Sequence, residues 1–198
     1  MIKYSELYED LYKVGYHGNK NHCHTLKILP ILSKYKGHKI LDVGCSHGLA
    51  VKKLIEMSYE AYGIDVSETA IKYCKERNLT TCLLGSATDI PFEDNFFDII
   101  ISSDTLEHIF PKDIDLVVNE FKRVCKKYLV LSIDLYEERN KSYTKKIDLG
   151  SKYGLKCLHT SKPTEWDNKF LQAGFIKLEE RFKNKKYIVT YQKTADAE

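Results

Sequence analysis

The sequence contains 198 residues, 43% of them hydrophobic, which is enough for one domain with a substantial core. The 31 Lys and Arg side chains nearly balance the 28 Asp and Glu side chains, so the overall charge gives little reason to expect strong binding to nucleic acid or to a membrane surface. Apolar runs are short and the N-terminus is polar, so we expect a cytoplasmic protein with no transmembrane span and no signal peptide.

Short β-rich segments alternate with helical segments from Lys39 onward, which is typical of a parallel sheet with helices on both faces. The region before Lys36 is predicted to be helical. Strands are predicted over residues 39–43, 59–64, 80–84, 97–101 and 128–133. Helices are predicted between them over residues 47–57, 67–78 and 113–125, with Ser67 as an N-cap. The near-continuous apolar run at 97–101 indicates a central strand that is buried on both faces.

The regular pattern dissolves between Tyr136 and Pro163, within a basic stretch that is either a loop over the acceptor or a solvated face. A helix over 164–173 and two strands over 175–182 and 187–191, joined by a turn at 183–186, are predicted to follow. We therefore expect a single domain over residues 1–198. It divides into an N-terminal helical cap (1–36), a cofactor-binding core (37–135), and a substrate loop with C-terminal strands (136–198).

A glycine-bearing turn follows the first predicted strand, in the segment from Asp42 to Gly48. Glycine at such a turn lets the backbone approach a ligand closely. Asp65 ends the second predicted strand, where a carboxylate can accept both hydroxyls of a ribose. The turn lacks the GxGxxG pattern of dinucleotide enzymes, and Asp42 stands before the first glycine, a position suited to a cationic ligand. Together these features favour S-adenosylmethionine over NAD.

Four segments in this order resemble the class I S-adenosylmethionine-dependent methyltransferase family: ILDVGCSHG at 40–48, YGID at 62–65, DIPF at 89–92 and FDII at 97–100. The resemblance implies an α/β fold, a Rossmann-like three-layer αβα sandwich around a seven-stranded, mostly parallel sheet. The implied strand order is 3-2-1-4-5-7-6, with the last strand antiparallel. It also implies S-adenosylmethionine as cofactor, S-adenosylhomocysteine as product, and methyl transfer as the activity.

The same resemblance assigns cofactor contacts to residues at the ends of the first four strands. It implies that the cofactor-binding residues are Asp42, Gly44, Cys45, Gly48, Asp65, Val66, Ser86, Ala87, Asp89 and Ser102. The family often has Asp-Ala after its third strand, whereas this chain has Ser86-Ala87. Recognition of the adenine amino group is therefore expected to pass to Ser86 or Asp89.

A hydroxyl acceptor benefits from a general base placed near the methyl group, beyond the strand ends. The expected catalytic residues are His108, His159 and Asp104, with Asp134 as a further candidate base. His108 lies in a Leu-Glu-His-Ile sequence after the fourth strand, where a capping or core-edge histidine is the alternative. The expected substrate-binding residues are Tyr16, in an N-terminal lid, together with Asp134 and Trp166.

The segments 158–160, 164–166 and 173–175 are loosely similar to methyltransferases of polysaccharide and glycan assembly, in which a His and a Trp flank the acceptor. Sugar O-methylation is the hypothesis that this similarity favours, although core packing is the alternative for Trp166. The sequence is also compatible with N- or O-methylation of another small metabolite, and with a non-catalytic cofactor-binding partner protein. The partner expected is a small-molecule or glycan acceptor and not nucleic acid; nothing in the sequence indicates an oligomeric state.

Six cysteines are scattered along the chain without a CxxC pair, which suits a reducing compartment. Histidines near the N-terminus, together with Cys23, suggest metal ligation, but no second cluster has the spacing of a zinc site. No metal is therefore expected.

Overall fold

The computed structural model describes residues 4–13, 23–134, 162–183 and 186–194. Within them, one seven-stranded sheet has the order β3-β2-β1-β4-β5-β7-β6. Neighbouring strands from β3 to β5 are parallel, and β7 is antiparallel to both β5 and β6. The expected fold class and strand order are confirmed. The strands are β1 (Lys39–Val43), β2 (Glu60–Asp65), β3 (Cys82–Leu84), β4 (Phe97–Ser103), β5 (Cys125–Asp134), β6 (Phe175–Lys183) and β7 (Lys186–Lys193).

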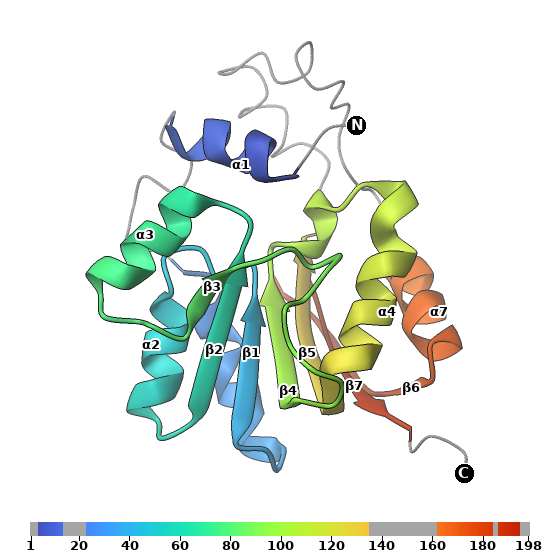
Figure 1. Ribbon diagram of the computed structural model, residues 1–198. Helices are drawn as coiled ribbons and strands as arrows, with labels where there is room; N and C mark the ends of the chain where they lie inside the picture. Colours follow the sequence, from blue (N-terminus) through green and yellow to red (C-terminus); the bar gives the residue numbers. More distant parts are fainter. Residues whose placement is uncertain (1–3, 14–22, 135–161, 184–185, 195–198) are drawn as a thin grey trace.

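Helices cover the sheet on both faces (Figure 1), so the described residues form three layers. They are α2 (Leu49–Glu56), α3 (Glu68–Glu76), α4 (Ile114–Val124) and α7 (Pro163–Gln172). One core cluster packs α4 and α7 on the sheet, and the other packs α2 and α3. The central strand β4 contributes to both clusters, since Ile100 belongs to the first and Ile99 to the second. Its apolar run is therefore explained by burial on two faces.

The N-terminal region forms one α-helix, α1 (Tyr4–Lys13), and two 3₁₀-helices over Thr25–Lys27 and Leu29–Lys34. Pro30 lies at the start of the second 3₁₀-helix, where its missing N–H costs least. Figure 1 shows α1 crossing above the edge of the sheet where the parallel strands end. The Glu9 carboxylate accepts hydrogen bonds from Ser67 and Thr69 and so ties α1 to the start of α3.

Most predicted elements agree with the structure, and the differences lie at element ends. Ser67 is the N-cap of α3, because its Oγ accepts the Ala70 N–H at 3.2 Å. The prediction of a turn over 183–186 is wrong at both ends, since Lys183 ends β6 and Lys186 begins β7. Strand β5 begins at Cys125, directly after α4, and not at 128. No described helix is long and apolar enough to cross a membrane.

Candidate active site

The turn after β1 has the backbone geometry of a close-approach loop. Gly44 and Gly48 have φ angles of 77° and 71°, in the left-handed region that favours glycine. A Cβ on Gly44 would lie 2.2 Å from the Thr105 Oγ1, so a side chain is excluded there on two grounds. The N–H groups of Gly44 and Cys45 both donate to the Ile64 carbonyl oxygen at 2.9 Å, which fixes the turn against β2.

Asp65 connects this turn with the end of β2. One carboxylate oxygen accepts the Ser46 N–H at 2.9 Å, and the other accepts the Ser67 N–H at 3.0 Å. Burial raises the pKa of Asp65 to about 6, against the lowering effect of these backbone hydrogen bonds. Each carboxylate oxygen can accept a further hydrogen bond, so the pair of oxygens can still receive two vicinal hydroxyls.

Asp42 lies on β1 beside this loop and is fully buried, with 0% of its surface exposed. Neither carboxylate oxygen has a hydrogen-bond partner among the described residues. Burial, followed by the negative charge of Asp65, raises the pKa of Asp42 to about 8. A buried carboxyl without a partner is costly, and a positively charged ligand at this sheet edge would lower that cost. The carboxyl groups of Asp42 and Asp65 therefore fit S-adenosylmethionine, which carries a sulfonium and an ammonium.

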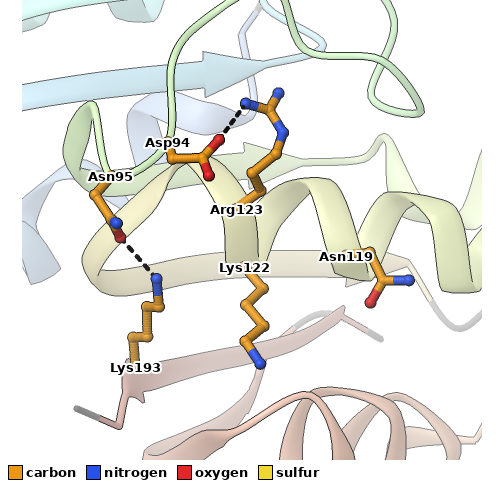
Figure 2. A pocket seen from close by; sticks show the side chains of 6 residues that line it. All are labelled: Asp94, Asn95, Asn119, Lys122, Arg123 and Lys193. Carbon is orange, nitrogen blue, oxygen red and sulfur yellow. Dashed lines mark hydrogen bonds and ion pairs between the residues drawn. The ribbon is translucent and has the colours of Figure 1, made fainter. Parts of the chain in front are cut away.

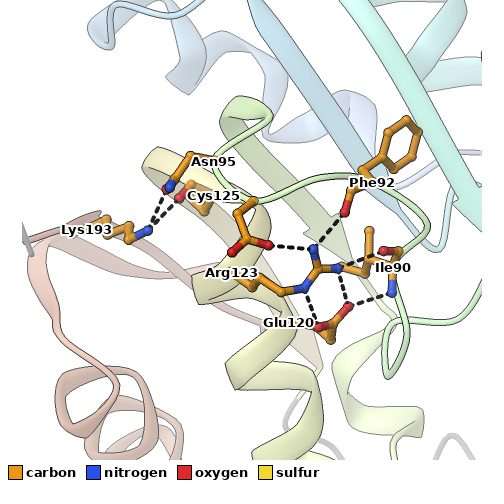
Figure 3. A network of polar contacts seen from close by, with 8 residues as sticks. Ile90, Phe92, Asn95, Glu120, Arg123, Cys125 and Lys193 are labelled. Atoms are coloured by element: carbon orange, nitrogen blue, oxygen red, sulfur yellow. Dashed lines mark hydrogen bonds and ion pairs between the residues drawn. The ribbon is translucent and has the colours of Figure 1, made fainter.

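The segment after β3 forms a tight turn that is held from outside by α4. Ser86 Oγ lies 2.7 Å from Thr88 Oγ1 and accepts the Thr88 N–H, while Asp89 is exposed. Figure 3 shows the Arg123 guanidinium donating to the carbonyl oxygens of Ile90 and Phe92 at 2.8 and 2.7 Å. Arg123 is itself bound to Glu120 at 2.7 Å, so the position of the turn depends on α4.

The remaining cofactor candidates differ in exposure. Val66 is partly exposed just beyond Asp65, and Ala87 is 7% exposed within the turn after β3. Ser102 is 1% exposed, and its Oγ donates to the Val43 carbonyl oxygen at 3.0 Å. The Ser102 hydroxyl thus joins β4 to β1 near the strand ends.

A charged cluster lies where β4 ends and β7 begins. The Asp104 carboxylate is bound by the Lys186 ammonium and by the His24 ring, and the Lys186 Nζ lies 2.7 Å from His24 Nδ1. Burial acts to raise the pKa of Asp104, but the His24 hydrogen bond and the Lys186 charge outweigh it and lower the pKa to about 2. Asp104 also has a left-handed backbone, with φ 56°, and such strain clusters at functional sites.

Glu107 and His108 extend this cluster along the 3₁₀-turn that follows β4. Glu107 is 5% exposed, and burial, followed by the charge of Asp104, raises its pKa well above the usual range. Burial lowers the pKa of His108, so the imidazole is neutral at neutral pH and able to accept a proton. The Asp134 N–H donates to Glu107 Oε1 at 3.4 Å. The structure therefore places Asp104, His108 and Asp134 around one strand edge.

Helix α1 contacts the strand edge at two places, the turn after β1 and the segment after β4. Tyr12 Oη lies 2.8 Å from Ser46 Oγ, and the Tyr12 ring meets His47 edge-on at 5.7 Å between centroids. Tyr8 meets His108 edge-on at 6.0 Å. The N-terminal helix thus contacts the turn after β1 and the exit of β4.

Of the other predicted substrate or catalytic residues, one lies in the core and two are not described. Tyr16 and His159 lie outside the described residues. Trp166 is 2% exposed and packs near Phe170, with 6.5 Å between ring centroids, so the structure places it in the hydrophobic core. The face of its indole ring is therefore not accessible to an acceptor, and the alternative interpretation of Trp166 as a core residue agrees with its burial.

A hollow of about 270 Å³ lies at the opposite edge of the sheet, near the start of β4. Figure 2 shows Asp94 paired with Arg123 and Asn95 paired with Lys193 along its wall. These contacts join the loop before β4 to α4 and β7. None of the charged-cluster residues at the end of β4 and the start of β7 lines this hollow.

Sequence reasoning missed His24, Glu107 and Lys186 at the charged cluster, and it also missed a group of three buried cysteines. Cys45, Cys74 and Cys82 have Sγ atoms that all lie within 4.8 Å of one another. Hydrogen bonds from Cys45 and then Cys82 lower the pKa of Cys74 to about 4. The scattered spacing hid this group, because its members come from a turn, a helix and a strand.

Comparisons with known proteins agree with this geometry. Residues 41–131 match the family model described as a methyltransferase domain. The ubiquinone biosynthesis O-methyltransferase of Pelagibacter ubique is 28% identical over 127 residues, which cover 62% of this chain and 52% of that protein. The demethylmenaquinone methyltransferase of Staphylococcus carnosus is 33% identical over 107 residues, or 50% of this chain and 44% of that protein. The chain thus spans about half the length of these curated relatives.

Among solved structures, the magnesium protoporphyrin IX methyltransferase of Synechocystis PCC 6803, crystallised with bound S-adenosylhomocysteine, superposes with a TM-score of 0.65. The match covers 98% of this chain and 89% of that one at 14% identity, so it shows a shared fold. The matched domain, the strand order and the turn after β1 all agree with one another. Residues 41–131 are therefore similar to the methyltransferase-domain family, and the described residues share the fold of a solved methyltransferase.

Proposed function

We propose that this chain transfers the methyl group of S-adenosylmethionine to a hydroxyl group of a small-molecule acceptor. The observation that carries the proposal is the buried, unpaired Asp42 carboxyl beside Asp65 at the carboxyl ends of β1 and β2. Two acids at one strand edge favour a cationic nucleoside and disfavour the pyrophosphate of a dinucleotide.

Each end of the cofactor has a chemically suitable partner. Asp65 would accept the ribose hydroxyls, Val66 and Ala87 would border the adenine, and Asp89 or Ser86 would accept a hydrogen bond from its amino group. The turn containing Gly44, Cys45 and Gly48 would hold the ribose and methionine parts, and Ser102 keeps β4 joined to β1 through its hydrogen bond to the Val43 carbonyl oxygen. When bound, S-adenosylmethionine supplies a methyl group activated by its sulfonium.

The acceptor side provides a proton acceptor and fixed charges. Methyl transfer to a hydroxyl requires the oxygen to lose its proton, and a neutral His108 is suited to take it. Asp104 stays ionised but is bound to Lys186 and His24, so it is better suited to orient the acceptor than to remove its proton. His159 is the second candidate base, and Tyr16 and Asp134 are candidate acceptor contacts.

Two acceptor classes compete. Names of the matched relatives favour a hydroxylated quinone precursor, because they include a ubiquinone biosynthesis O-methyltransferase. The sugar hydroxyl favoured by residues 158–166 has less support, since Trp166 is 2% exposed and offers no open ring face. We therefore place a phenolic hydroxyl first and a sugar hydroxyl second.

Calorimetric titration tests the cofactor, with S-adenosylmethionine and S-adenosylhomocysteine as ligands and NAD as the control. Micromolar binding of the first two alone supports the proposal; preference for NAD contradicts it. Formation of S-adenosylhomocysteine is then measured with matched panels of catechols, hydroquinones and sugars. Cofactor binding without turnover on any acceptor would indicate a non-catalytic partner protein, and turnover only with amines would contradict O-methylation.

A variant pair tests the base. His108→Ala is expected to lower kcat by about 10²-fold or more if His108 takes the proton. The control is His38→Ala, at an exposed position before β1, which should retain the activity of the unmodified protein. If His108→Ala is normal and His159→Ala is not, the base lies on the segment after β5.

A further inference from the structure

Three cysteines from separate elements lie close together at the turn after β1. Cys45 belongs to the turn after β1, Cys74 to α3, and Cys82 is the first residue of β3. Their Sγ atoms all lie within 4.8 Å of one another, and the residues are 2%, 0% and 1% exposed. Free cysteines often pack as small apolar groups, but three thiols this close together also offer three sulfur ligands to a single ion.

An oxygen donor lies against the same group. The Ser46 carbonyl oxygen is 3.3 Å from Cys74 Sγ and 3.9 Å from Cys45 Sγ. Ser46 has a φ angle of 50°, a strained left-handed conformation for a residue with a side chain. The turn is therefore held in a conformation that brings a carbonyl oxygen toward two of the three sulfur atoms.

We propose that Cys45, Cys74 and Cys82 form a binding site for one thiophilic divalent metal ion of the zinc type, with the Ser46 carbonyl oxygen facing the fourth position. A Zn–S distance of about 2.3 Å in a tetrahedron gives S···S separations of about 3.8 Å. Side-chain rotations that move the sulfurs by about 1 Å suffice to reach this arrangement from separations of up to 4.8 Å. Thiols that are still protonated release their protons to solvent as they bind the ion.

The surroundings favour a cation. The fully buried Asp42 carboxyl has no hydrogen-bond partner among the described residues, and its charge acts on Cys82. Asp65 interacts electrostatically with Cys74. Carboxyl groups on two neighbouring strands thus act electrostatically on the sulfurs, and a bound divalent ion would favour the ionised forms of these acids and thiols.

Such an ion would cross-link the parts that shape the cofactor turn. A Cβ on Gly48 would lie only 2.9 Å from Cys74 Sγ, so the turn and α3 are already in close contact. Coordination by Cys45 fixes the turn to α3 and β3 at once. Metal loading is therefore expected to stabilise the folded protein whether or not cofactor or acceptor is present.

The test uses the whole chain, reduced, stripped with a chelator and returned to metal-free buffer. Zn²⁺ is titrated in competition with a chromophoric chelator, and Co²⁺ is added separately to look for sulfur-to-cobalt charge-transfer absorption. We expect one ion per chain, a thiolate–cobalt spectrum, and a melting temperature that rises with Zn²⁺. Cys82→Ser should weaken Zn²⁺ binding by at least about tenfold and lose the rise in melting temperature.

Cys125→Ser is the matched control, because Cys125 is equally buried but lies away from the cluster on β5. It should bind Zn²⁺ as the unmodified chain does. The proposal is overturned if Cys82→Ser binds as tightly as Cys125→Ser, or if Co²⁺ gives no sulfur charge transfer in the unmodified protein. The cobalt spectrum needs no variant, so a folding defect in Cys82→Ser leaves the test intact.

Discussion

The two halves of the strand edge are built in different ways. In the cofactor half, formed by β1 and β2, Asp65 is held by backbone N–H groups of Ser46 and Ser67. In the proposed acceptor half, where β4 ends and β7 begins, Asp104 is held by the side chains of His24 and Lys186. The first half depends on backbone geometry within a short segment, and the second depends on charged side chains from distant segments.

Because of this difference, we expect substitutions in the two halves to affect different properties. Backbone donors stay in place when a neighbouring side chain changes, so the cofactor half should lose ligand affinity before it loses stability. Charged partners that are buried together leave an uncompensated charge when one is removed. The acceptor half should therefore lose stability first.

The largest effect is expected for Lys186→Met. Removing the ammonium leaves the Asp104 carboxylate partly buried without its main cationic partner, which should reduce the free energy of unfolding by about 3 kcal/mol. Urea unfolding at pH 7 measures it. The control is Lys34→Met, whose partner Glu179 and own side chain are 38% and 57% exposed, with an expected loss below about 1 kcal/mol. Equal losses would show that the charged cluster contributes no more to stability than an exposed ion pair does.

Asp65→Asn should act mainly on the cofactor. Loss of the charge that receives the ribose hydroxyls is expected to weaken S-adenosylmethionine binding by about 1.5–3 kcal/mol, measured by calorimetry. Glu68→Gln, at an exposed position in the first turn of α3, should bind normally. An unchanged affinity in folded Asp65→Asn would remove Asp65 from the ribose site.

Asp42 predicts a pH dependence of stability. Its pKa is raised from 3.8 to about 8 in the folded protein, so the folded state holds this proton more tightly than the unfolded state does. The resulting stabilisation is present below pH 4 and is lost as the pH rises toward 8, with a slope of up to about 1.4 kcal/mol per pH unit. Asp42→Asn should reduce this slope in urea unfolding between pH 5 and 8, while Asp65 and Glu107, whose pKa values are also raised by burial, keep their own contributions. Asp115→Asn, an exposed control, should keep it.

The smallest effect is expected for Ser67→Ala. This change removes the N-cap of α3 and the hydrogen bond to Glu9 of α1, at 3.2 and 2.9 Å. The expected loss is about 1 kcal/mol in the free energy of unfolding. Ser33→Ala, whose exposed hydroxyl donates to the nearby Pro30 carbonyl oxygen, should lose less than about 0.5 kcal/mol. A larger loss in the control would mean that capping is not the cause.

The contrast between the halves also decides what the sequence reveals. The sheet order is implied by the family resemblance. The Gly44 turn and the strand-end acids Asp42 and Asp65 follow from local patterns, because each depends on residues within one β–α unit. Lys186 lies next to other lysines in the sequence, and this pattern predicts a solvated hairpin turn. In the structure, tertiary packing leaves Lys186 only 7% exposed. The sequence singles out His24 only within the N-terminal group of His and Cys residues, because its partner Asp104 is 80 positions away.

The cysteine cluster shows the same limit. Ligand spacing in sequence is informative when the ligands share a loop or a hairpin, as in most small zinc sites. Cys45, Cys74 and Cys82 meet only because β1, β2 and β3 are parallel neighbours and α3 packs beside them. Their proximity depends on the fold, and no local spacing indicates it.

The position of Lys186 at the start of an antiparallel strand has a consequence for biosynthesis. Asp104 and Lys186 are separated by 82 positions, so the ribosome needs roughly 4–16 seconds at about 5–20 residues per second to supply the second after the first. During that interval, the nascent chain holds the parallel strands β1 to β4 but not the ammonium that stabilises the exit of β4. The acceptor half is therefore completed late in translation, and a pause before β7 would prolong exposure of an unfinished sheet edge to the cell's chaperones.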